Sequence, residues 1–389
     1  MPQALPSIIA ALLLLIGALG LALQYGGNHA LLWGLGAALG YTLYRGSFSF
    51  AGGFREALAD GRGAGLRAQM LMLGILVTVM LPAIQAGTLA GAPVRGIVFP
   101  AGVAVVIGAF IFGIGMQLGG GCASGTLYTA GGGNTRMLLT LIFFIIGATI
   151  AAYDAERWAD LPALSATTLP ELIGLWPALL GSLAIFLCVA LGSRVIEQRR
   201  YGRIEPIFSA SSPDASRRWS WAMAAIILAA LNIITLWAAG RPWVITASFP
   251  LWGSQIIAEL GWDEPAFWAF WEDPTRTEAF LRPLLAERSS VMNFGLMLGA
   301  FFAAAIAARF SPTWRLPWRH VGASVIGGLL LGYGAVMASG CNISAYVAGI
   351  ASGSLHGWLW ILPGIAGNWV GLRLRPLFRL DRQEISSKF

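Results

Sequence analysis

Two ten-residue stretches of this chain decide its fold: residues 113–122 read GIGMQLGGGC and residues 332–341 read GYGAVMASGC. Both follow the pattern Gly-x-Gly-(x)6-Cys, with a further glycine directly before the cysteine. Each stretch ends an apolar segment long enough to cross a bilayer, precedes a segment of small residues, and leads into another apolar segment. We therefore interpret them as corresponding parts of two similar halves.

Composition indicates that these halves belong to a membrane protein. Hydrophobic residues make up 57% of the 389 residues, charged residues only 11%, and the mean hydropathy is +0.71. A soluble domain usually has about 25% charged residues, so this chain lacks the polar residues to cover a water-exposed surface. The same composition excludes a disordered chain, and three widely spaced cysteines exclude a disulfide-stapled secreted scaffold. The predicted fold is an all-α polytopic membrane protein, with a single integral membrane domain over residues 1–389.

Uncharged stretches predict where the chain crosses the membrane. A helix needs about 20 predominantly apolar residues to span a bilayer. Gly-, Ser- and Cys-rich segments at 119–136 and 339–356 interrupt the two longest uncharged stretches. Segments 25–56 and 243–258 are predicted to form short or re-entrant helical elements. Nine spans are predicted, at 6–24, 68–94, 98–118, 138–153, 172–193, 219–240, 289–308, 320–338 and 357–372.

The distribution of Lys and Arg predicts the orientation of these spans. Nineteen of the 25 basic residues fall on one predicted face, whereas six fall on the other together with eleven of the 18 acidic residues. Short basic loops remain in the cytoplasm, so the face with nineteen is predicted to be cytoplasmic. Nine crossings then place the N-terminus in the periplasm and the C-terminus in the cytoplasm of a bacterial inner-membrane protein. The net charge of +7 therefore reflects loops and does not indicate nucleic-acid binding.

These directions make the two halves, residues 1–200 and 215–389, opposite in topology. The helix before Cys122 is predicted to run inward and the helix before Cys341 outward. Inverted-topology repeats of this kind bring broken helices to the middle of the bilayer in transporters. Irregular backbone at that depth is stable only when it is buried in protein or lines a cavity. The alternative is that both breaks are ordinary surface loops, but such loops normally contain charged residues and these contain almost none.

The segments GGGCASG at 119–125 and ASGCN at 338–342 resemble loops of the YeeE/YedE family of sulfur-transport membrane proteins. The resemblance extends over most of the chain, from about residue 30 to 375. It implies a nine-span, hourglass-shaped protein with an inverted repeat, which passes thiosulfate inward along cysteines near a constriction. It also implies that a small cytoplasmic TusA-like sulfur-carrier protein works beside the transporter.

One segment departs from the pattern of that family. The family has a third cysteine in an early stretch of the form Phe-Cys-Phe-Thr-x-x-x-Arg-Asp, whereas residues 48–56 of this chain read FSFAGGFRE. Ser49 therefore stands where the resemblance leads us to expect a cysteine. The identity of the transported ion is left open between thiosulfate and another small sulfur- or selenium-containing anion.

The chemistry of such an anion explains why these residue types suit a pathway. Thiosulfate has a soft terminal sulfur and hard sulfonate oxygens, and burying it is costly unless donors replace its water. Thiols can contact the soft sulfur, whereas backbone N–H groups at helix N-termini and side-chain donors can take the oxygens. No metal or cofactor is predicted. The predicted pathway residues are Cys122, Cys341, Ser49, Gly121, Gly340, Ser124, Thr126, Asn342 and Ser344.

Other notable residues are expected to have mainly structural roles. Cys188 is predicted to be a small buried hydrophobic residue, and Asn293 and Asn368 are predicted to bond between helices. His356 and Arg136 follow the two breaks near a membrane interface and are secondary candidates for attracting the ion. A tryptophan-rich segment is predicted to form an interfacial belt, with Trp243, Trp252, Trp262, Trp268 and Trp271.

The sequence predicts a transporter and not an enzyme. Predicted spans contain none of the intramembrane carboxylates typical of proton-coupled carriers, and the chain has no ATP-binding loop motif. These features favour facilitated or channel-like import of thiosulfate or a related small anion. The alternatives are a membrane thiol redox or sulfurtransferase enzyme that uses Cys122 and Cys341, and a permease for an unrelated solute. The absence of a Cys-x-x-Cys motif, haem-ligand histidine pairs and a nucleotide-binding fold disfavours the enzyme.

Overall fold

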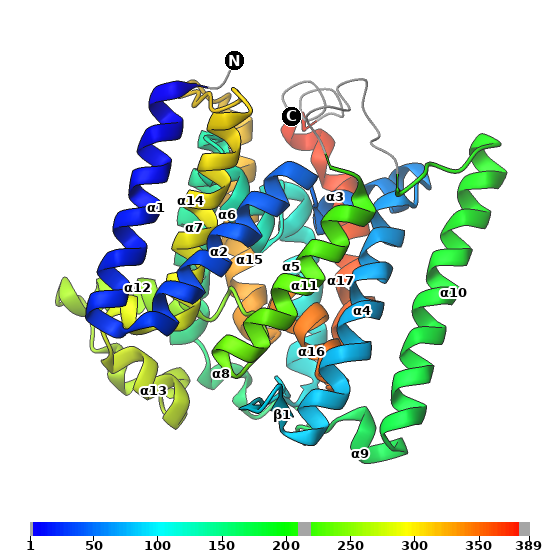
Figure 1. The fold of residues 1–389 in the computed structure, drawn as a ribbon, viewed down its shortest axis with the longest axis horizontal. Helices are drawn as coiled ribbons and strands as arrows, with labels where there is room; N and C mark the ends of the chain where they lie inside the picture. The colour runs from blue at the N-terminus through cyan, green and yellow to red at the C-terminus, as the bar shows by residue number, and fades with distance from the viewer. Residues whose placement is uncertain (1–2, 209–218, 381–389) are drawn as a thin grey trace.

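The computed structural model describes residues 3–208 and 219–380, and it consists almost entirely of helices. Long helices lie side by side between two ends of the molecule (Figure 1). The long helices are α1 (Ala4–Tyr25), α2 (Gly27–Gly46), α4 (Ala64–Ala86), α5 (Val103–Gly119), α7 (Thr135–Tyr153), α10 (Leu175–Tyr201), α11 (Trp221–Ala239), α14 (Arg288–Ile306), α15 (Trp318–Met337) and α17 (Leu355–Leu374).

Short elements connect the long helices. Two antiparallel pairs of two-residue strands are present, β1 (Thr88–Leu89) with β2 (Ala92–Pro93) and β3 (Ala101–Gly102) with β4 (Ala163–Leu164). The short helices are α3 (Phe50–Arg55), η1 (Glu56–Asp60), α6 (Ala123–Gly131), α8 (Glu156–Ala159), α9 (Leu169–Ile173), α12 (Ser248–Glu259), η2 (Pro265–Phe267), η3 (Ala269–Trp271), α13 (Pro274–Leu281), η4 (Leu284–Ala286), η5 (Asn342–Val347), α16 (Ala348–Ala351) and η6 (Arg375–Phe378).

The predicted membrane-protein class is confirmed. Within the described residues, eight helical segments are long and apolar enough to cross a membrane: α1, α4, α5 continued through α6, α7, α10, α11, α14, and α15 continued through α16. They correspond to eight of the nine predicted spans. The ninth, 357–372, lies in α17, which has the length of a span but contains the polar residues His356 and Asn368, both fully buried.

The N-terminal part of the chain differs from the prediction. Segment 25–56 was expected to be short or re-entrant, but α2 is a continuous 20-residue helix. It returns the chain along the bundle, so Gln3 lies beside the C-terminal end of α14, where its backbone N–H donates to Ala305 O (3.1 Å) and its side-chain amide to Phe310 O (3.0 Å). The prediction that the N-terminus lies on the face opposite to residues 309–319 is therefore wrong. Figure 1 shows α1 beginning at the same end of the bundle where η6 ends.

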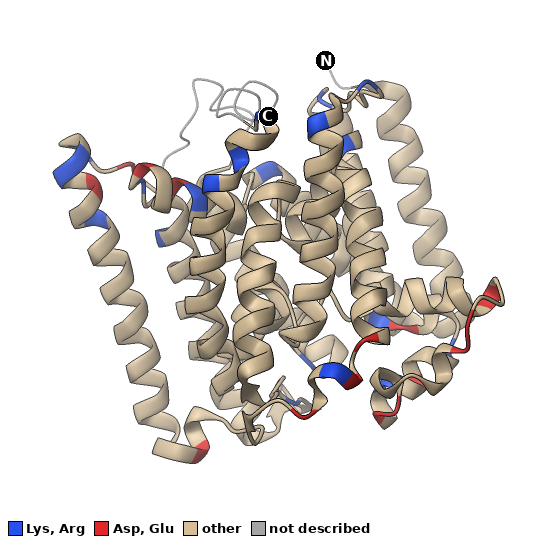
Figure 2. Cartoon of the chain, turned by 180° about the vertical axis from the view of Figure 1, so that it is seen from behind, with Lys and Arg blue, Asp and Glu red and all other residues tan. Residues whose placement is uncertain are grey.

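The charged residues separate into two faces, as the sequence predicts. Figure 2 shows Lys and Arg gathered mainly at one end of the bundle and most Asp and Glu at the other. We call these ends the basic face and the acidic face. The basic face comprises residues 45–67, 193–208, 309–319 and 373–380, and the acidic face comprises residues 87–102, 154–174 and 240–288.

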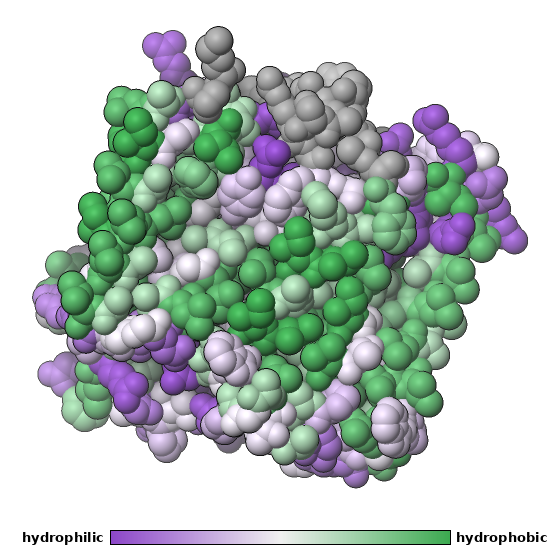
Figure 3. All heavy atoms as spheres, viewed as in Figure 1, coloured by the Kyte–Doolittle hydropathy of each residue, from purple (hydrophilic) through white to green (hydrophobic). Residues whose placement is uncertain are grey.

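Two helices form the lateral edges of the molecule. Only 11% of the residues in the apolar part of α1 and 17% of those in α10 are buried. Figure 3 shows hydrophobic residues along both helices, at opposite edges of the view. Because so much apolar surface would be unfavourable in water, α1 and α10 are the helices that contact the lipid most extensively.

Glycines bring the central helices into close contact. Helices α5 and α15 run in opposite directions, since Gly108 lies against Gly334 while Gly119 lies against Gly327. A Cβ atom on Gly334 would lie only 2.6 Å from the carbonyl oxygen of Gly108. Small residues at such contacts let helix backbones approach in a membrane protein. The prediction that the helices before Cys122 and Cys341 have opposite directions is thus confirmed.

Candidate functional site

The first cysteine loop follows directly from the end of α5. Gly120 has a φ of 93°, a left-handed conformation that glycine adopts without the penalty of a side chain, and it turns the chain out of the helix. Cys122 is then the N-terminal capping residue of α6 and is buried. Its sulfur lies 3.3 Å from the hydroxyl oxygen of Ser124, and the backbone of Gly125 also faces the thiol. The loop thus holds the thiol inside the protein at a helix N-terminus.

The second cysteine loop repeats this arrangement at the end of α15. Gly340 has a φ of 146°, and Cys341 precedes the π-helix η5 as its N-terminal capping residue. The thiol is fully buried, with its sulfur 3.6 Å from the hydroxyl oxygen of Ser344. Gly121 and Gly340 therefore occupy the same position before the two thiols, as the sequence pattern predicts.

A network of hydrogen bonds ties the second loop to the segment between α11 and α12. The hydroxyl of Ser344 accepts a bond from the backbone N–H of Ile245 (3.2 Å) and lies 3.3 Å from the hydroxyl of Thr246. Thr246 also faces the sulfur of Cys341. Asn293 on α14 holds this segment by donating to the carbonyl oxygen of Ile245 (3.0 Å), as expected for a residue that bonds between helices. No local sequence pattern marks Thr246, because its contact with Ser344 joins residues 98 apart in the chain.

Two polar side chains in the loops have unused hydrogen-bonding capacity. Thr126 and Asn342 are both fully buried. Neither the hydroxyl oxygen of Thr126 nor either polar atom of the Asn342 amide has a hydrogen-bond partner among the described residues. Leaving a buried polar group unpaired costs about 1–3 kcal/mol, so such groups usually have a partner in the working protein. These two unpaired side chains lie in the same loops as the two thiols.

The two loops lie close to each other in the core. Helix α6 contacts η5, and both thiols are buried. Tyr346 on η5 packs against aromatic rings from both α3 and α17, with ring centroids 6.2 Å from Phe50 and 6.4 Å from Trp360. Aromatic rings therefore close the space around the second loop on the side of α3.

Ser49 is positioned at the start of α3. Its hydroxyl accepts a bond from the backbone N–H of Gly52 (3.0 Å), which makes it the N-terminal cap of this helix. Helix α3 is in turn held by Gln117 of α5, whose amide donates to Ala51 O (3.3 Å) and to Asn368 of α17 (2.7 Å). The bond predicted for Asn368 between helices is therefore present. Ser49 has a local capping role, and its half-buried hydroxyl is bonded within its own segment.

A basic group lies on the basic-face side of the first loop. Arg55 at the end of α3 lies near Tyr128 of α6, and Tyr128 lies near Cys122. Burial lowers the pKa of Arg55, and the charges of Glu56 and Asp60 oppose that shift. Arg55 belongs to the family-like segment 48–56, but the sequence does not mark it as near the site, because its nearness to Tyr128 arises from tertiary packing between segments far apart in the chain.

Three secondary predictions have different outcomes. Arg136 is engaged structurally, since its guanidinium donates to Leu118 O (2.7 Å) and to the hydroxyl of Ser324 (3.2 Å). His356 is buried and bonded to Ser354 (2.8 Å), so it is not presented to solvent as an ion-attracting group. The prediction that Cys188 is buried is wrong, because it lies on the exposed side of the peripheral helix α10.

The predicted tryptophan belt is mostly wrong. Trp262 is exposed, but the other four tryptophans are buried. The indole N–H of Trp252 donates to Ser290 (2.8 Å) and that of Trp271 donates to Ser254 (3.2 Å). The segment that holds α12 and η3 folds against α7, and the ring of Trp252 stacks on Phe294 of α14.

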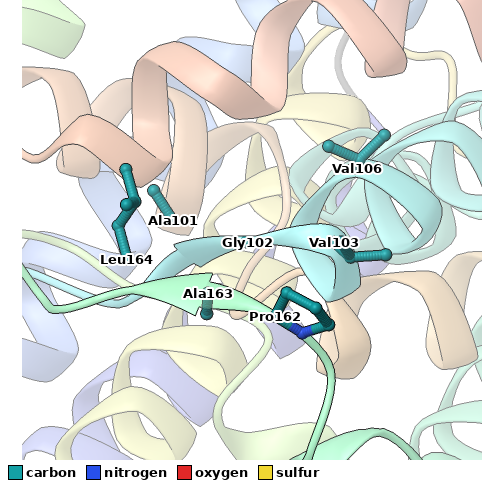
Figure 4. A pocket seen from close by; sticks show the side chains of 7 residues that line it. All are labelled: Ala101, Gly102, Val103, Val106, Pro162, Ala163 and Leu164. Atoms are coloured by element: carbon teal, nitrogen blue, oxygen red, sulfur yellow. The ribbon is translucent and has the colours of Figure 1, made fainter.

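An open pocket of about 440 Å³ lies at the acidic face, beside strands β3 and β4 and the start of α5 (Figure 4). Its apolar lining offers no side-chain donor to an anion, and we assign it no role in binding. The lining residues are Ala101, Gly102, Val103, Val106, Pro162, Ala163 and Leu164. Among residues 3–208 and 219–380, no group of three or more His, Cys, Asp or Glu side chains is placed to hold a metal ion.

Comparison with known proteins agrees with this architecture. A family described as sulphur transport matches residues 45–370 of the chain. Two proteins named thiosulfate transporter TsuA align over 86% of the chain: that of Spirochaeta thermophila is 28% identical and 95% covered, and that of Escherichia coli is 26% identical and 91% covered. A probable transporter YedE of Salmonella typhimurium is 32% identical over 41% of the chain and 40% of its own length. The resemblance seen in the two Gly-Cys segments is thereby confirmed, and the chain belongs to the sulphur transport family of membrane transporters.

Proposed function

We propose that this transporter imports thiosulfate, or a closely related sulfur- or selenium-containing anion, along a central pathway lined by the two cysteine loops. One observation carries the proposal: each buried thiol lies in the same loop as a buried polar side chain without a protein partner, Thr126 beside Cys122 and Asn342 beside Cys341. The relatives named thiosulfate transporters support this choice of substrate.

Each loop offers a complementary set of contacts to a sulfur oxyanion. The thiol of Cys122 or Cys341 contacts the soft terminal sulfur, while the oxygens accept bonds from nearby hydroxyl, amide and backbone N–H groups. The N-terminus of α6, which begins directly after Cys122, adds a favourable dipole for negative charge. Because these contacts are individually weak, the anion can leave each loop as readily as it enters. The mutual nearness of the loops lets it pass from one thiol to the other.

We further propose that the chain contains an inverted repeat. The order α2, α3, α4, α5, α6 and α7 recurs as α11, α12, α14, α15, η5 with α16, and α17. The contacts between helices recur as well. The packing of α2 against α14 corresponds to that of α11 against α4, and the packing of α5 against α17 corresponds to that of α15 against α7. This recurrence supports two halves, 1–200 and 215–389, that face each other with opposite topology. Each half supplies one cysteine loop to the pathway.

The proposal includes an orientation in the bacterial inner membrane. The basic face lies in the cytoplasm, where a TusA-like sulfur carrier could receive the anion or its sulfur, a partner suggested by the family resemblance alone. Single cysteines at Ser165 and Trp314, both exposed, test the orientation in a Cys188→Ser background. A membrane-impermeant maleimide added to intact cells should label the Ser165 site on the acidic face and not the Trp314 site. Labelling of Trp314 alone would reverse the orientation.

Uptake into proteoliposomes tests the function itself. Vesicles containing the protein should accumulate ³⁵S-thiosulfate faster than empty vesicles, and the recovered label should still be thiosulfate. Conversion to sulfite and a persulfide would instead support the sulfurtransferase alternative. Growth on single sulfur sources, in a strain without other sulfate and thiosulfate importers, identifies the preferred anion. Absence of both uptake and growth on every sulfur anion tested would contradict the proposal.

A further inference from the structure

Three arginines gather around the end of α11 on the acidic face. The backbone N–H of Arg95 donates to Gly240 O (2.9 Å), and the guanidinium of Arg288 donates to the carbonyl oxygen of Ala239. Arg241 follows directly in the chain and interacts electrostatically with both other arginines. An open pocket of about 430 Å³ lies here, lined by the side chains of Arg95 and Arg288 together with residues 92–94 and 237–240.

The charge of this cluster is only partly neutralised. Arg241 pairs with Glu287 (3.2 Å), and its guanidinium also donates to Ser289 (3.2 Å). Arg95 and Arg288 are exposed, and Glu287 is the carboxylate that pairs with Arg241. A single cation would be enough to stabilise the carbonyl end of α11, so three exceed that structural need.

The cluster differs from the other arginines of the acidic face in its excess of positive charge. On the rest of the acidic face each of the three other arginines has a carboxylate nearby: Arg157 pairs with Asp154 (3.3 Å), Arg282 pairs with Glu278 (2.5 Å), and Arg276 interacts with Asp273. With eleven acidic residues against six arginines, this face as a whole repels a dianion. An anion approaching from this side is therefore attracted to one region, the end of α11.

The same region leads to the second cysteine loop. The chain continues from Arg241 to Ile245 and Thr246, which contact Ser344 beside Cys341. Asn293, five residues beyond Arg288 on α14, holds Ile245 from the other side. Two segments thus connect the arginine cluster to the second loop. One runs from Arg241 to Thr246 and the other from Arg288 to Asn293, and both reach the surroundings of the Cys341 thiol.

We propose that Arg95, Arg241 and Arg288 form a collecting site for small divalent oxyanions, thiosulfate among them, at the acidic-face entrance of the pathway. The inference rests on the proposed function and extends it to the step before the anion loses its water. The exposed guanidinium groups hold a hydrated anion by charge, which raises its local concentration without the tight binding that would prevent its release. Arg241 is shared with Glu287, so Arg95 and Arg288 provide most of the attraction.

Charge-neutral variants of the two exposed arginines test the site. Arg95→Gln with Arg288→Gln should raise the thiosulfate concentration for half-maximal uptake several-fold at low ionic strength and leave the maximal rate unchanged. High salt should remove most of the difference, because screening weakens the attraction in the wild type. The matched control, Arg157→Gln with Arg282→Gln, removes the same charge from the same face and should behave as the wild type. Equal effects of both pairs, or a reduced maximal rate alone, would overturn the inference.

A direct binding measurement separates this inference from the proposed function. Purified protein in nanodiscs should bind ³⁵S-thiosulfate or ³⁵S-sulfate in a saturable, salt-sensitive manner, and the Arg95→Gln/Arg288→Gln variant should lose most of this binding. If the anion binds in an arginine-dependent manner but the protein transports no sulfur anion, the proposed function is contradicted and the arginine site is supported. If the wild type transports thiosulfate and the arginine variant binds and takes it up equally well, the arginine site is contradicted and the proposed function is not.

Discussion

The two cysteine loops share a sequence pattern but are held in place differently. After Cys122 the chain forms the regular helix α6, and the hydroxyl facing the thiol comes from Ser124 in the same loop. After Cys341 the chain forms a π-helix, and Ser344 is bonded to Ile245 and Thr246 of a distant segment. The first loop is therefore a local unit, whereas the second depends on the fold around it.

The difference shows that one sequence motif can begin two different kinds of helix. A π-helix contains one more residue per hydrogen-bonded turn than an α-helix, and such segments often occur at functional sites. In η5 the carbonyl oxygen of Cys341 accepts bonds from both Ala345 (2.7 Å) and Tyr346 (3.4 Å). This winding places Tyr346 against the aromatic rings of α3 and α17. The second loop thus combines a thiol with an aromatic wall.

The largest expected effect comes from removing the thiols. We expect Cys122→Ala and Cys341→Ala each to reduce initial thiosulfate uptake into proteoliposomes by at least about 30-fold. Losing one weak hydrogen bond costs only about 0.5–1.5 kcal/mol, or roughly 2- to 13-fold, so a larger defect means that the thiol acts at the transport barrier itself.

Cys188→Ala is the matched control for both variants. Its thiol is exposed on α10, and uptake should remain within about two-fold of the wild type because no pathway contact is lost. Normal uptake by both loop variants would remove the cysteines from the pathway. A defect in only one would show that the two loops are not equivalent in function.

The glycines before the thiols should differ in their tolerance of a side chain. At Gly340 a Cβ atom would lie 2.7 Å from the backbone nitrogen of Ala345, whereas at Gly120 it would meet the flexible end of Met137 at 2.9 Å. Both have positive φ, which costs an L-residue about 1–2 kcal/mol. Gly340→Ala should therefore lower the melting temperature in detergent by several degrees more than Gly120→Ala. Equal shifts would indicate that η5 adjusts as easily as a methionine side chain.

The hydroxyl groups around the thiols should have moderate effects. Thr246→Val removes a cross-segment contact to Ser344 and a group facing Cys341, and we expect uptake to fall by about 3- to 10-fold, consistent with about 0.5–1.5 kcal/mol per hydrogen bond. Ser124→Ala removes a contact within a loop that the backbone of Gly125 still supports, so uptake should fall by about two-fold. A larger effect of Ser124→Ala would reverse the proposed difference between the loops.

The smallest expected effect concerns Ser49. In Ser49→Cys the weak acceptor sulfur replaces the hydroxyl that caps α3, which should lower the free energy of unfolding by about 0.5–1 kcal/mol. Uptake should remain, with a preference shifted toward thiosulfate over sulfate in competition assays. Ser49→Ala has the same loss of the cap without a thiol and serves as the control. An identical preference in both variants would show that position 49 does not contact the anion.

Much of the fold could be predicted because long apolar stretches and arginine-rich loops carry strong physical signals. Eight predicted spans, the two broken segments and the opposed directions of α5 and α15 all follow from these signals. Helix α2 was missed because it contains glycines, Asn28 and His29, which lower its apolar character although the helix is shielded by α1, α11 and α14. That single error reversed the predicted position of the N-terminus.

The site could be predicted less completely. The Gly-Cys pattern located Cys122, Cys341 and their neighbouring hydroxyls, since these residues are adjacent in sequence. Thr246 belongs to the same network only through tertiary packing, and no local pattern marks it. The sequence predicts an interfacial belt of five tryptophans, but tertiary packing buries four of them. The sequence therefore indicates which polar groups a loop contains more readily than which distant residues pack against that loop.

The glycine contact between α5 and α15 has a mechanical consequence. With backbones this close, sliding or tilting one helix against the other would drive carbonyl oxygens into Cα atoms, and interiors packed to this density resist small deformations. These two central helices therefore form a stiff frame, and large displacement of α5 against α15 is energetically unfavourable. In the mechanism proposed above, opening for the anion then depends on side-chain rotation and on the short helices α6 and η5. Transport of this kind should respond weakly to bilayer thickness, in contrast to carriers that move whole domains.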